Sequence, residues 1–380
     1  MSTESFLVRR PLLARDGKFA AYMFRSVGAA NADAYDGVLD TDAKADSRLV
    51  FLEDVPAGLT TPGAGDSKRF VAMVSADDGA DRIAPLKAKG FSVCARVAGT
   101  APSALVNMGA ADYIWWDAKV AGDLSVPAKA AQRIPGKRVA GGVGSRDAFD
   151  QGKELGAQLF EGEWYLRVDG NSNKPITPAQ STILELTNMI QTEAPVARIE
   201  QALKRDATIS FRLLRYINSA GFGLQCEITS FRHALSILGY QNLGRWLALL
   251  LATAGAGTAA PALMREAAAR GRLSELIGHD LVDAQERDTL FIVGVFSLLP
   301  AILQLPMPQL LDQLNLAENV TDALLTRQGL YGPILRLAEA LESDDEALIS
   351  RLAFDLQLDA AQLNRHHVTA LTWADRLSLQ

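Results

Sequence analysis

The hydrophobic pattern of this 380-residue chain changes its period near residue 170. Before that point, short apolar runs of strand length alternate with helix-length or polar segments, which is typical of a sheet with crossover helices. After it, apolar residues recur every three or four positions, as they do on one face of a helix. A chain that holds both patterns and exceeds the usual size of one hydrophobic core is expected to form two domains.

Eight candidate strands precede the change of period. They are 6–13, 19–25, 48–52, 69–74, 91–97, 112–116, 138–140 and 157–160. Helix-length segments such as 81–89 and 146–155 lie between them, and each ends before a glycine, a common helix stop. The first half is therefore predicted to be α/β with a parallel sheet, arranged as a layer or a barrel.

A segment rich in Gly, Asn and Pro separates the two patterns, which predicts an α/β domain at 1–168, a linker at 169–176 and a helical domain at 177–380. Thr177 and Gln180 form a capping-box pattern at the start of the first helix, with proline at its first position. Without a fixed repeat length, the second half is predicted to be a compact bundle of about ten or more short helices. The expected helices include 231–238, 241–254, 261–277, 286–304 and 359–378.

Charge and composition narrow the classes of function. The net charge is −6 and neither half carries a basic stripe, which counts against nucleic-acid binding. The uncharged stretch 246–264 is broken by glycines and a proline, so we expect no membrane span. Two cysteines and an N-terminus unlike a secretory signal predict a cytoplasmic protein.

Residues typical of catalytic chemistry are few. His279-Asp280 is predicted to lie on a connection between helices, and His366-His367 is expected to be a surface pair. The sequence holds no nucleophile elbow, no phosphate-binding loop ending in Lys-Ser or Lys-Thr and no CxxC motif. The glycine-rich run 141–144 is interpreted as a strand-end turn, with phosphate binding as the lesser alternative. We therefore predict no catalytic residue, no cofactor and no metal.

The stretch LLRYINSAGFGLQCEITSFRHALSILGYQNLGRWLALLL, residues 213–251, resembles the central signature of HDOD domains. That family is a helical relative of HD phosphohydrolases without their metal ligands. In FIVGVFSLLPAIL, residues 291–303, Ser297-Leu298 stands at the positions where catalytic HD proteins carry His-Asp. The resemblance implies a helical domain without HD chemistry.

The first half, beginning FLVRRPLLARDGKFAAYMFRS, is similar to EAL domains, which hydrolyse cyclic di-GMP in a (β/α)8 barrel with acidic metal ligands at strand ends. The resemblance implies an incomplete or degenerate EAL-like barrel followed by a multi-helix HDOD bundle. It also implies that the family's site residues are replaced, because their positions fall at Ala21, Ala95-Arg96, Trp115, Gly141, Gly144 and Glu161-Gly162.

These losses predict a non-catalytic bacterial signalling protein that acts by binding other signalling or regulatory proteins, in a cyclic di-GMP-related or other bacterial regulatory network. Candidate partner contacts are Arg215, Asn218, Arg232 and Arg245, whose alternative role is intramolecular pairing. The loss of ligands counts against cyclic di-GMP binding. The alternative left open is a non-hydrolysing sensor with nucleotide contacts at Arg96, Trp115 and Trp116, although the two tryptophans fit a buried core better. A phosphodiesterase with an unrecognised site is the least favoured hypothesis.

Overall fold

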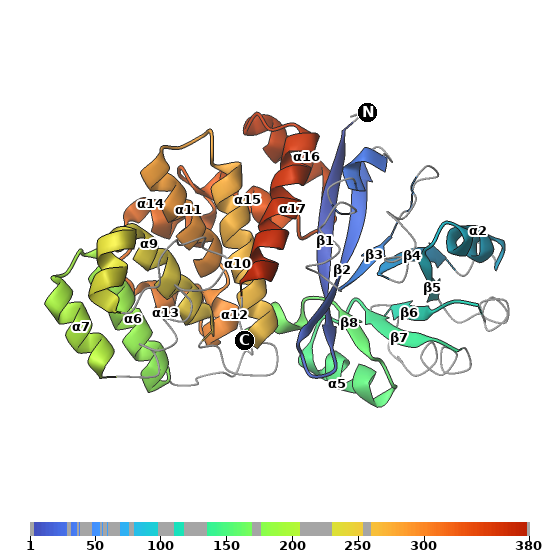
Figure 1. Ribbon diagram of the computed structural model, residues 1–380, viewed down its shortest axis with the longest axis horizontal. Coiled ribbons are helices and arrows are strands. Elements are labelled where there is room, and N and C mark those ends of the chain that lie inside the picture. Colours follow the sequence, from blue (N-terminus) through green and yellow to red (C-terminus); the bar gives the residue numbers. More distant parts are fainter. Residues whose placement is uncertain are drawn as a thin grey trace. The chain divides into compact units, whose positions relative to one another are not determined.

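The computed structural model describes residues 4–28, 32–35, 38, 48–53, 55, 59, 69–75, 80–97, 110–117, 135–168, 176–205, 230–253 and 260–377. The chain divides into two units (Figure 1). The first, which we call the barrel unit, comprises Met1–Tyr165 together with Leu341–Ile349 and Asp359–Asn364. The second, the helical unit, comprises Leu166–Ala340, Ser350–Leu358 and Arg365–Gln380.

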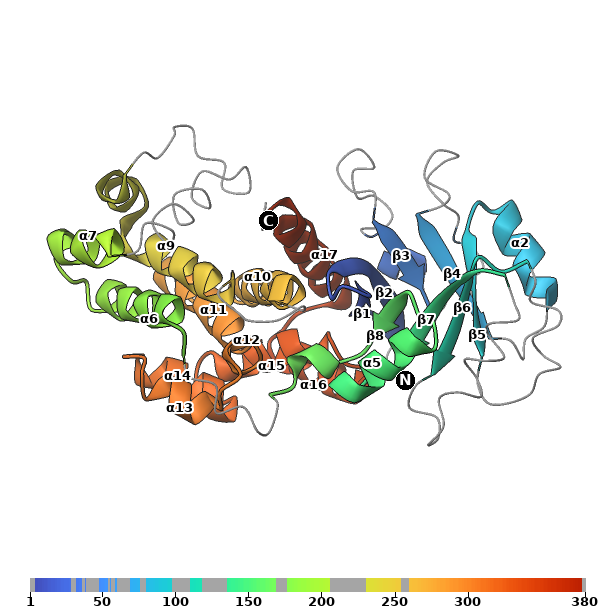
Figure 2. The same ribbon diagram turned by 90° about the horizontal axis from the view of Figure 1, so that it is seen from below.

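The sheet of the barrel unit closes on itself as a barrel of eight strands in sequence order (Figure 2). The strands are β1 (Ser5–Ala14), β2 (Phe19–Gly28), β3 (Leu49–Leu52), β4 (Phe70–Ser75), β5 (Ser92–Val97), β6 (Tyr113–Asp117), β7 (Lys137–Gly141) and β8 (Leu159–Glu161). All eight predicted strands are confirmed. The expected combination of a strand barrel with a helical bundle is confirmed as well, and the barrel is complete in its strands.

One strand departs from the predicted parallel sheet. β1 pairs antiparallel with both β2 and β8, whereas β2 to β8 pair in parallel. The reason is the short connection after β1, where Ala14 N donates to Lys18 O at 2.8 Å and Gly17 has a φ of 77°. Such a turn joins neighbouring antiparallel strands, while a parallel pair needs a long crossover.

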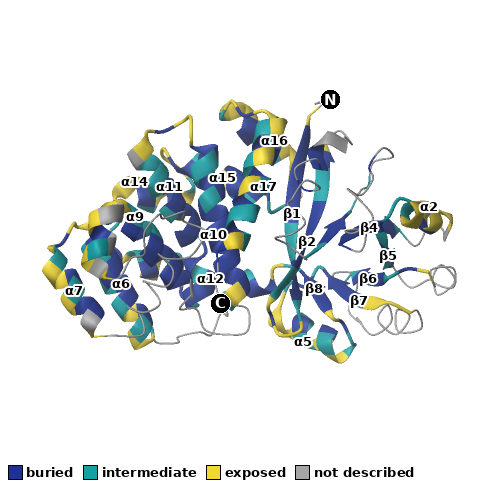
Figure 3. Cartoon of the chain, in the orientation of Figure 1, coloured by how far each residue is buried: buried dark blue, intermediate teal, exposed yellow. Residues whose placement is uncertain are grey.

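The interior of the barrel is apolar because alternate side chains of each strand point inward. Its core cluster consists of Leu12, Ala21, Met23, Phe51, Val71, Met73, Cys94, Tyr113, Trp115, Val139 and Leu159. Figure 3 shows the strands as mostly buried. Among the described residues, α2 (Ile83–Ala88) and α5 (Arg146–Glu154) are the α-helices that lie between strands.

Helices make up the rest of the described chain, as predicted. They are α6 (Pro178–Gln191), α7 (Val196–Lys204), α9 (Phe231–Thr253), α10 (Ala260–Ile277), α11 (Ala284–Phe296), α12 (Leu299–Leu303), α13 (Met307–Leu311), α14 (Glu318–Thr326), α15 (Gly332–Ala340), α16 (Glu346–Asp355) and α17 (Ala360–Arg376). The capping box of Thr177 and Gln180 is present at the start of α6. A backbone kink at Gly239, with φ 72°, separates the two predicted helices inside α9.

Two expectations for the helices are wrong. The single helix predicted over 286–304 ends at Phe296, because Pro300 lacks the N–H needed to continue the ladder and instead stands in the first turn of α12. His366-His367 is not a surface pair. His367 is fully buried. Burial of His366 lowers its pKa, and the positive charge of the neighbouring Arg365 lowers it further.

Two further expectations concern the linker and the membrane. Residues 169–175 of the predicted linker lie outside the described residues. In the part of the chain that the structure describes, no helix combines the length and apolar character needed to cross a membrane.

Candidate functional site

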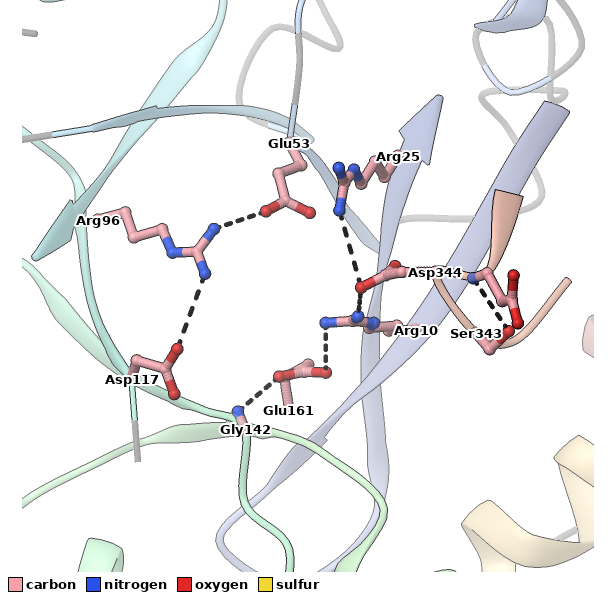
Figure 4. A network of polar contacts seen from close by, with 10 residues as sticks. Arg10, Arg25, Glu53, Arg96, Asp117, Gly142, Glu161, Ser343 and Asp344 are labelled. Atoms are coloured by element: carbon pink, nitrogen blue, oxygen red, sulfur yellow. Dashed lines mark hydrogen bonds and ion pairs between the residues drawn. The ribbon is translucent and has the colours of Figure 1, made fainter. Parts of the chain in front are cut away.

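The carboxyl ends of the parallel strands carry a group of charged side chains (Figure 4). Barrels built from parallel strands place their active sites at this end. We call the group the strand-end ring and define it as Arg10, Arg25, Glu53, Arg96, Asp117, Glu161 and Asp344. Six of these residues belong to Met1–Tyr165, and Asp344 comes from Leu341–Ile349 of the same unit.

Strand periodicity explains why the ring faces the barrel axis. In a strand, residues two positions apart point to the same side. Arg25, Arg96 and Asp117 each follow an interior residue by two positions, namely Met23, Cys94 and Trp115. Glu53 and Glu161 stand in the same relation to Phe51 and Leu159. The change from apolar to charged therefore occurs at the same level around the barrel, where its interior opens.

Arginines pair with the carboxylates of the ring. Arg96 Nη1 lies 2.6 Å from Glu53 Oε1, and Arg96 Nη2 lies 3.8 Å from Asp117 Oδ2. Arg10 binds Glu161 at 3.3 Å and also pairs with Asp344. Glu161, only 6% exposed in its side chain, also accepts a hydrogen bond of 2.7 Å from Gly142 N. This use of the Gly142 N–H fits the strand-end turn predicted for the glycine-rich run.

A cavity of about 520 Å³ opens beside the ring. Its described lining includes three arginines, Arg25, Arg82 and Arg96, together with the carboxylates of Glu53, Asp344 and Glu346. Backbone and side-chain atoms at the ends of β2 and β4 complete the wall. The cavity therefore offers several guanidinium groups to an anion, and each arginine presents a planar set of donors.

The barrel interior below the ring is filled where the resemblance places polar site residues. Trp115 is 3% exposed, and its indole ring packs against Gly141 so closely that a Cβ at position 141 would collide with it. Trp116 is fully buried. Burial also raises the pKa of the Cys94 thiol well above its ordinary value. Trp115 and Gly141 are thus complementary in size.

The ring does not fit a pair of divalent metal ions as it stands. Glu53 and Asp117 are bound by Arg96, and both oxygens of Glu161 are used by Arg10 and Gly142. Among the residues that the structure describes, no group of three or more His, Cys, Asp or Glu side chains is placed to hold a metal ion.

An arginine also contacts the serine that stands at the HD-like position of the helical unit. Ser297 Oγ accepts a hydrogen bond of 2.8 Å from Arg270 and donates one of 2.7 Å to the carbonyl of Gly294. Arg270 is buried and lies 3.7 Å from Glu339. His279 and Asp280 form an exposed pair on the turn between α10 and α11, as predicted for a connection.

The predicted partner contacts occupy different environments. Arg232 is exposed on α9 and pairs with Glu200 at 2.8 Å, which raises its pKa further. Arg245 is only 16% exposed; it binds Glu275 and Asp288 at 2.8 and 2.7 Å and stacks over a phenylalanine ring. Arg215 and Asn218 lie outside the described residues. A role of these four residues in partner recognition stays a prediction.

Of the three predicted nucleotide contacts, Arg96 lines the cavity, whereas the described lining does not include Trp115 or Trp116. Sequence reasoning also named Glu161, as a replaced EAL position, and missed Arg10, Arg25, Glu53, Asp117 and Asp344 of the strand-end ring. A charged residue two positions after an apolar one, repeated at the ends of several strands, is the signal that identifies Arg25, Glu53 and Asp117.

Comparison with known proteins identifies the helical part. Residues 176–314 match the family model of the HDOD domain. The cyclic di-GMP phosphodiesterase CdgJ of Vibrio cholerae is 26% identical over 237 residues, which are 62% of this chain and 55% of the relative. The uncharacterized protein YuxH of Bacillus subtilis is 26% identical over 240 residues, 62% of this chain and 58% of the relative. The chain thus spans less than two thirds of the length of these relatives.

Solved structures similar to this chain include the PaMucR phosphodiesterase in complex with cyclic di-GMP, with 12% identity and a TM-score of 0.33 over 42% of this chain and 94% of that one. A putative phosphohydrolase from Shewanella amazonensis matches with 14% identity and a TM-score of 0.38 over 52% of this chain and 93% of that one.

These comparisons correct one prediction. The prediction that the chain is not an enzyme is wrong, because a relative of 26% identity is named a cyclic di-GMP phosphodiesterase.

Proposed function

We propose that this chain, whose residues 176–314 form an HDOD domain, acts in cyclic di-GMP signalling and binds cyclic di-GMP at the mouth of its barrel. The observation that carries the proposal is the cavity of about 520 Å³, lined by Arg25, Arg82 and Arg96. The name of the relative CdgJ supports the choice of ligand. This replaces the expectation that cyclic di-GMP binding is doubtful.

The chemistry of the ligand suits this lining. A cyclic dinucleotide carries two phosphates and two planar bases, and guanidinium groups bind phosphates through paired hydrogen bonds and stack on flat rings. Arg96 is 41% exposed and Arg25 is 40% exposed, so both side chains can reach a ligand without unfolding the barrel wall.

Calorimetric titration of the full chain with cyclic di-GMP tests this proposal. We expect saturable binding that weakens about tenfold in Arg96→Gln, because a hydrogen bond to a charged group contributes about 1.5–3 kcal/mol. Lys18→Gln is the matched control: it removes the same charge from the turn before β2, at the opposite end of the barrel, and should bind like the wild type.

Two outcomes contradict the proposal. One is no heat and no thermal stabilisation with cyclic di-GMP, and the other is equal weakening in Lys18→Gln and Arg96→Gln.

The same samples, incubated with Mg²⁺ or Mn²⁺ and analysed by chromatography, show whether bound nucleotide is hydrolysed to the linear dinucleotide. Turnover would assign this chain the activity named for CdgJ.

A second role, recognition of regulatory proteins, is favoured for the helical unit. Among the described residues, the exposed large apolar side chains all belong to this unit, and Phe354 is 83% exposed. The others are Leu281, Leu325 and Leu330. Exposed apolar groups are common at protein contacts. Capture with the full chain from its host followed by mass spectrometry tests this role, and the absence of any reproducible partner would count against it.

A cytoplasmic location stays a prediction.

A further inference from the structure

A segment near the C-terminal end of the chain completes the barrel mouth. Leu341–Ile349 belongs to the barrel unit although about 175 residues separate it from the last strand-forming part of that unit. Arg9 N of β1 donates to Leu341 O at 3.0 Å, and the fully buried guanidinium of Arg9 pairs with Glu342 at 3.1 Å. These two contacts fix the start of the segment against β1.

The fixed segment places one carboxylate in the strand-end ring. Asp344 pairs with Arg10, and Asp344 Oδ2 lies 3.7 Å from Arg25 Nη1 (Figure 4). Asp344 also lines the cavity. Because Asp344 contacts two arginines, its carboxylate occupies guanidinium N–H groups that a ligand phosphate would otherwise bind.

We propose that Asp344 is an internal competitor of the anionic ligand, so that a ligand phosphate must displace its carboxylate from Arg25 and Arg10. This inference rests on the proposed function and adds its regulation. The described lining of the cavity carries three arginines and three carboxylates, for a net charge of zero. Displacing or neutralising Asp344 leaves a net charge of +1, which favours an anion.

The exposure of the pairs sets the size of the effect. Arg10, Arg25 and Asp344 are 28%, 40% and 34% exposed in their side chains, so each pair is partly screened by water. Pairs of this kind contribute modestly to stability. The apparent affinity of a ligand that must displace them is reduced by the fraction of molecules in which Asp344 has left the two arginines. We expect Asp344→Asn to raise the affinity for the anion about three- to tenfold.

The chain connects this competitor to the helical unit. Ala340 ends both α15 and a segment of the helical unit, and Leu341 follows it directly. Asp344 is therefore joined to the end of α15 by the short segment 341–343.

Titration of the full chain, its Asp344→Asn variant and its Asp345→Asn variant with cyclic di-GMP and, separately, with inorganic pyrophosphate tests the inference. Asp345→Asn is the matched control, since it removes the same charge one position away. Asparagine also keeps the acceptor that Asp345 offers to Leu348 N at 3.0 Å. Thermal unfolding of each variant confirms that it is folded.

Tighter binding of both anions by Asp344→Asn alone is the expected result. Equal affinities of all three proteins for cyclic di-GMP overturn the competitor while leaving the proposed function intact. Failure of cyclic di-GMP to bind any of them, with pyrophosphate bound more tightly by Asp344→Asn, overturns the proposed ligand but supports the competitor. Failure of both anions to bind any variant overturns both.

Discussion

At the scale of single residues, the barrel interior depends on a matched pair of side chains. Trp115 fills the space that a side chain at position 141 would need, since a Cβ there would collide with the indole. The resemblance identified both positions as replaced, but it could not show that the replacements fit each other. That complementarity follows from the pairing of β6 with β7, which places Trp115 opposite Val139, two positions before Gly141 on the same face of the sheet.

The pair predicts a specific effect on stability. Gly141→Ala should lower the free energy of unfolding by about 1–3 kcal/mol, because it adds a methyl group to a filled core. Denaturant unfolding of the full chain measures the change. Trp115→Leu in the same chain should recover part of the loss, since it removes the ring that the methyl group meets. Equal stability of Gly141→Ala and the wild type would contradict the tight packing.

The strand-end ring could be predicted only in part at this scale. Arg96 was singled out from the resemblance, whereas the position of Asp344 in the ring depends on a contact with Arg10 across more than 300 residues of sequence. No local pattern encodes such a pairing. Charges at the ends of neighbouring strands follow from the two-residue period, but their partners from outside the sheet do not.

At the scale of elements, β1 shows how a strand edge is completed. Its last residues, 12–14, pair with β8. Along the same edge, the backbone of its first residues bonds to a side chain instead. Asn364 of α17 accepts a hydrogen bond of 2.8 Å from Leu7 N and donates one of 2.9 Å to Ser5 O. One side-chain amide therefore makes both bonds that a neighbouring strand would make. An uncovered strand edge is prone to pair with other chains.

Removing that amide should be costly. Asn364 is buried, so Asn364→Ala leaves the N–H of Leu7 and the carbonyl of Ser5 without these bonds, and each unsatisfied group costs about 1–3 kcal/mol. We expect a loss of about 2–5 kcal/mol in the free energy of unfolding. Thr369→Ala, at an exposed position of the same helix, is the control and should change stability by less than about 0.5 kcal/mol. Similar losses for both variants would refute the role of Asn364.

Element prediction succeeded where the period was strong and failed where a proline intervened. The eight strands follow from short apolar runs bounded by turn residues, and the capping box at Thr177 marks the start of α6. Apolar residues continue through 286–304 at helical spacing, so the pattern alone did not show the break after Phe296. The antiparallel direction of β1 could have been read from its short connection to β2.

At the scale of the whole molecule, the grouping of the chain differs from its order in sequence. The predicted boundaries, 1–168 and 177–380, rest on the change of period and stay a prediction. In the structure, Leu341–Ile349 and Asp359–Asn364 group with Met1–Tyr165. Periodicity reports the type of each element but not its neighbours, so sequence reasoning could not place these two segments beside β1.

This grouping predicts that residues 1–168 do not fold alone. Without the C-terminal segments, Leu7 and Ser5 lose Asn364, and the fully buried Arg9 loses Glu342. The fragment also leaves this edge of β1 uncovered, and an uncovered strand edge is prone to pair with other chains.

The fragment 1–168 and the full chain should therefore unfold in different ways. We expect the full chain to unfold cooperatively with heat and the fragment to lack both a cooperative transition and dispersed amide resonances. Adding a peptide of residues 336–377 in trans should restore a transition, and the same peptide carrying Asn364→Ala should do so less effectively. A fragment that melts cooperatively on its own would mean that β1 needs no cover from the C-terminal segments, and Asp344 would then be an accessory to the barrel mouth, not part of the barrel's fold.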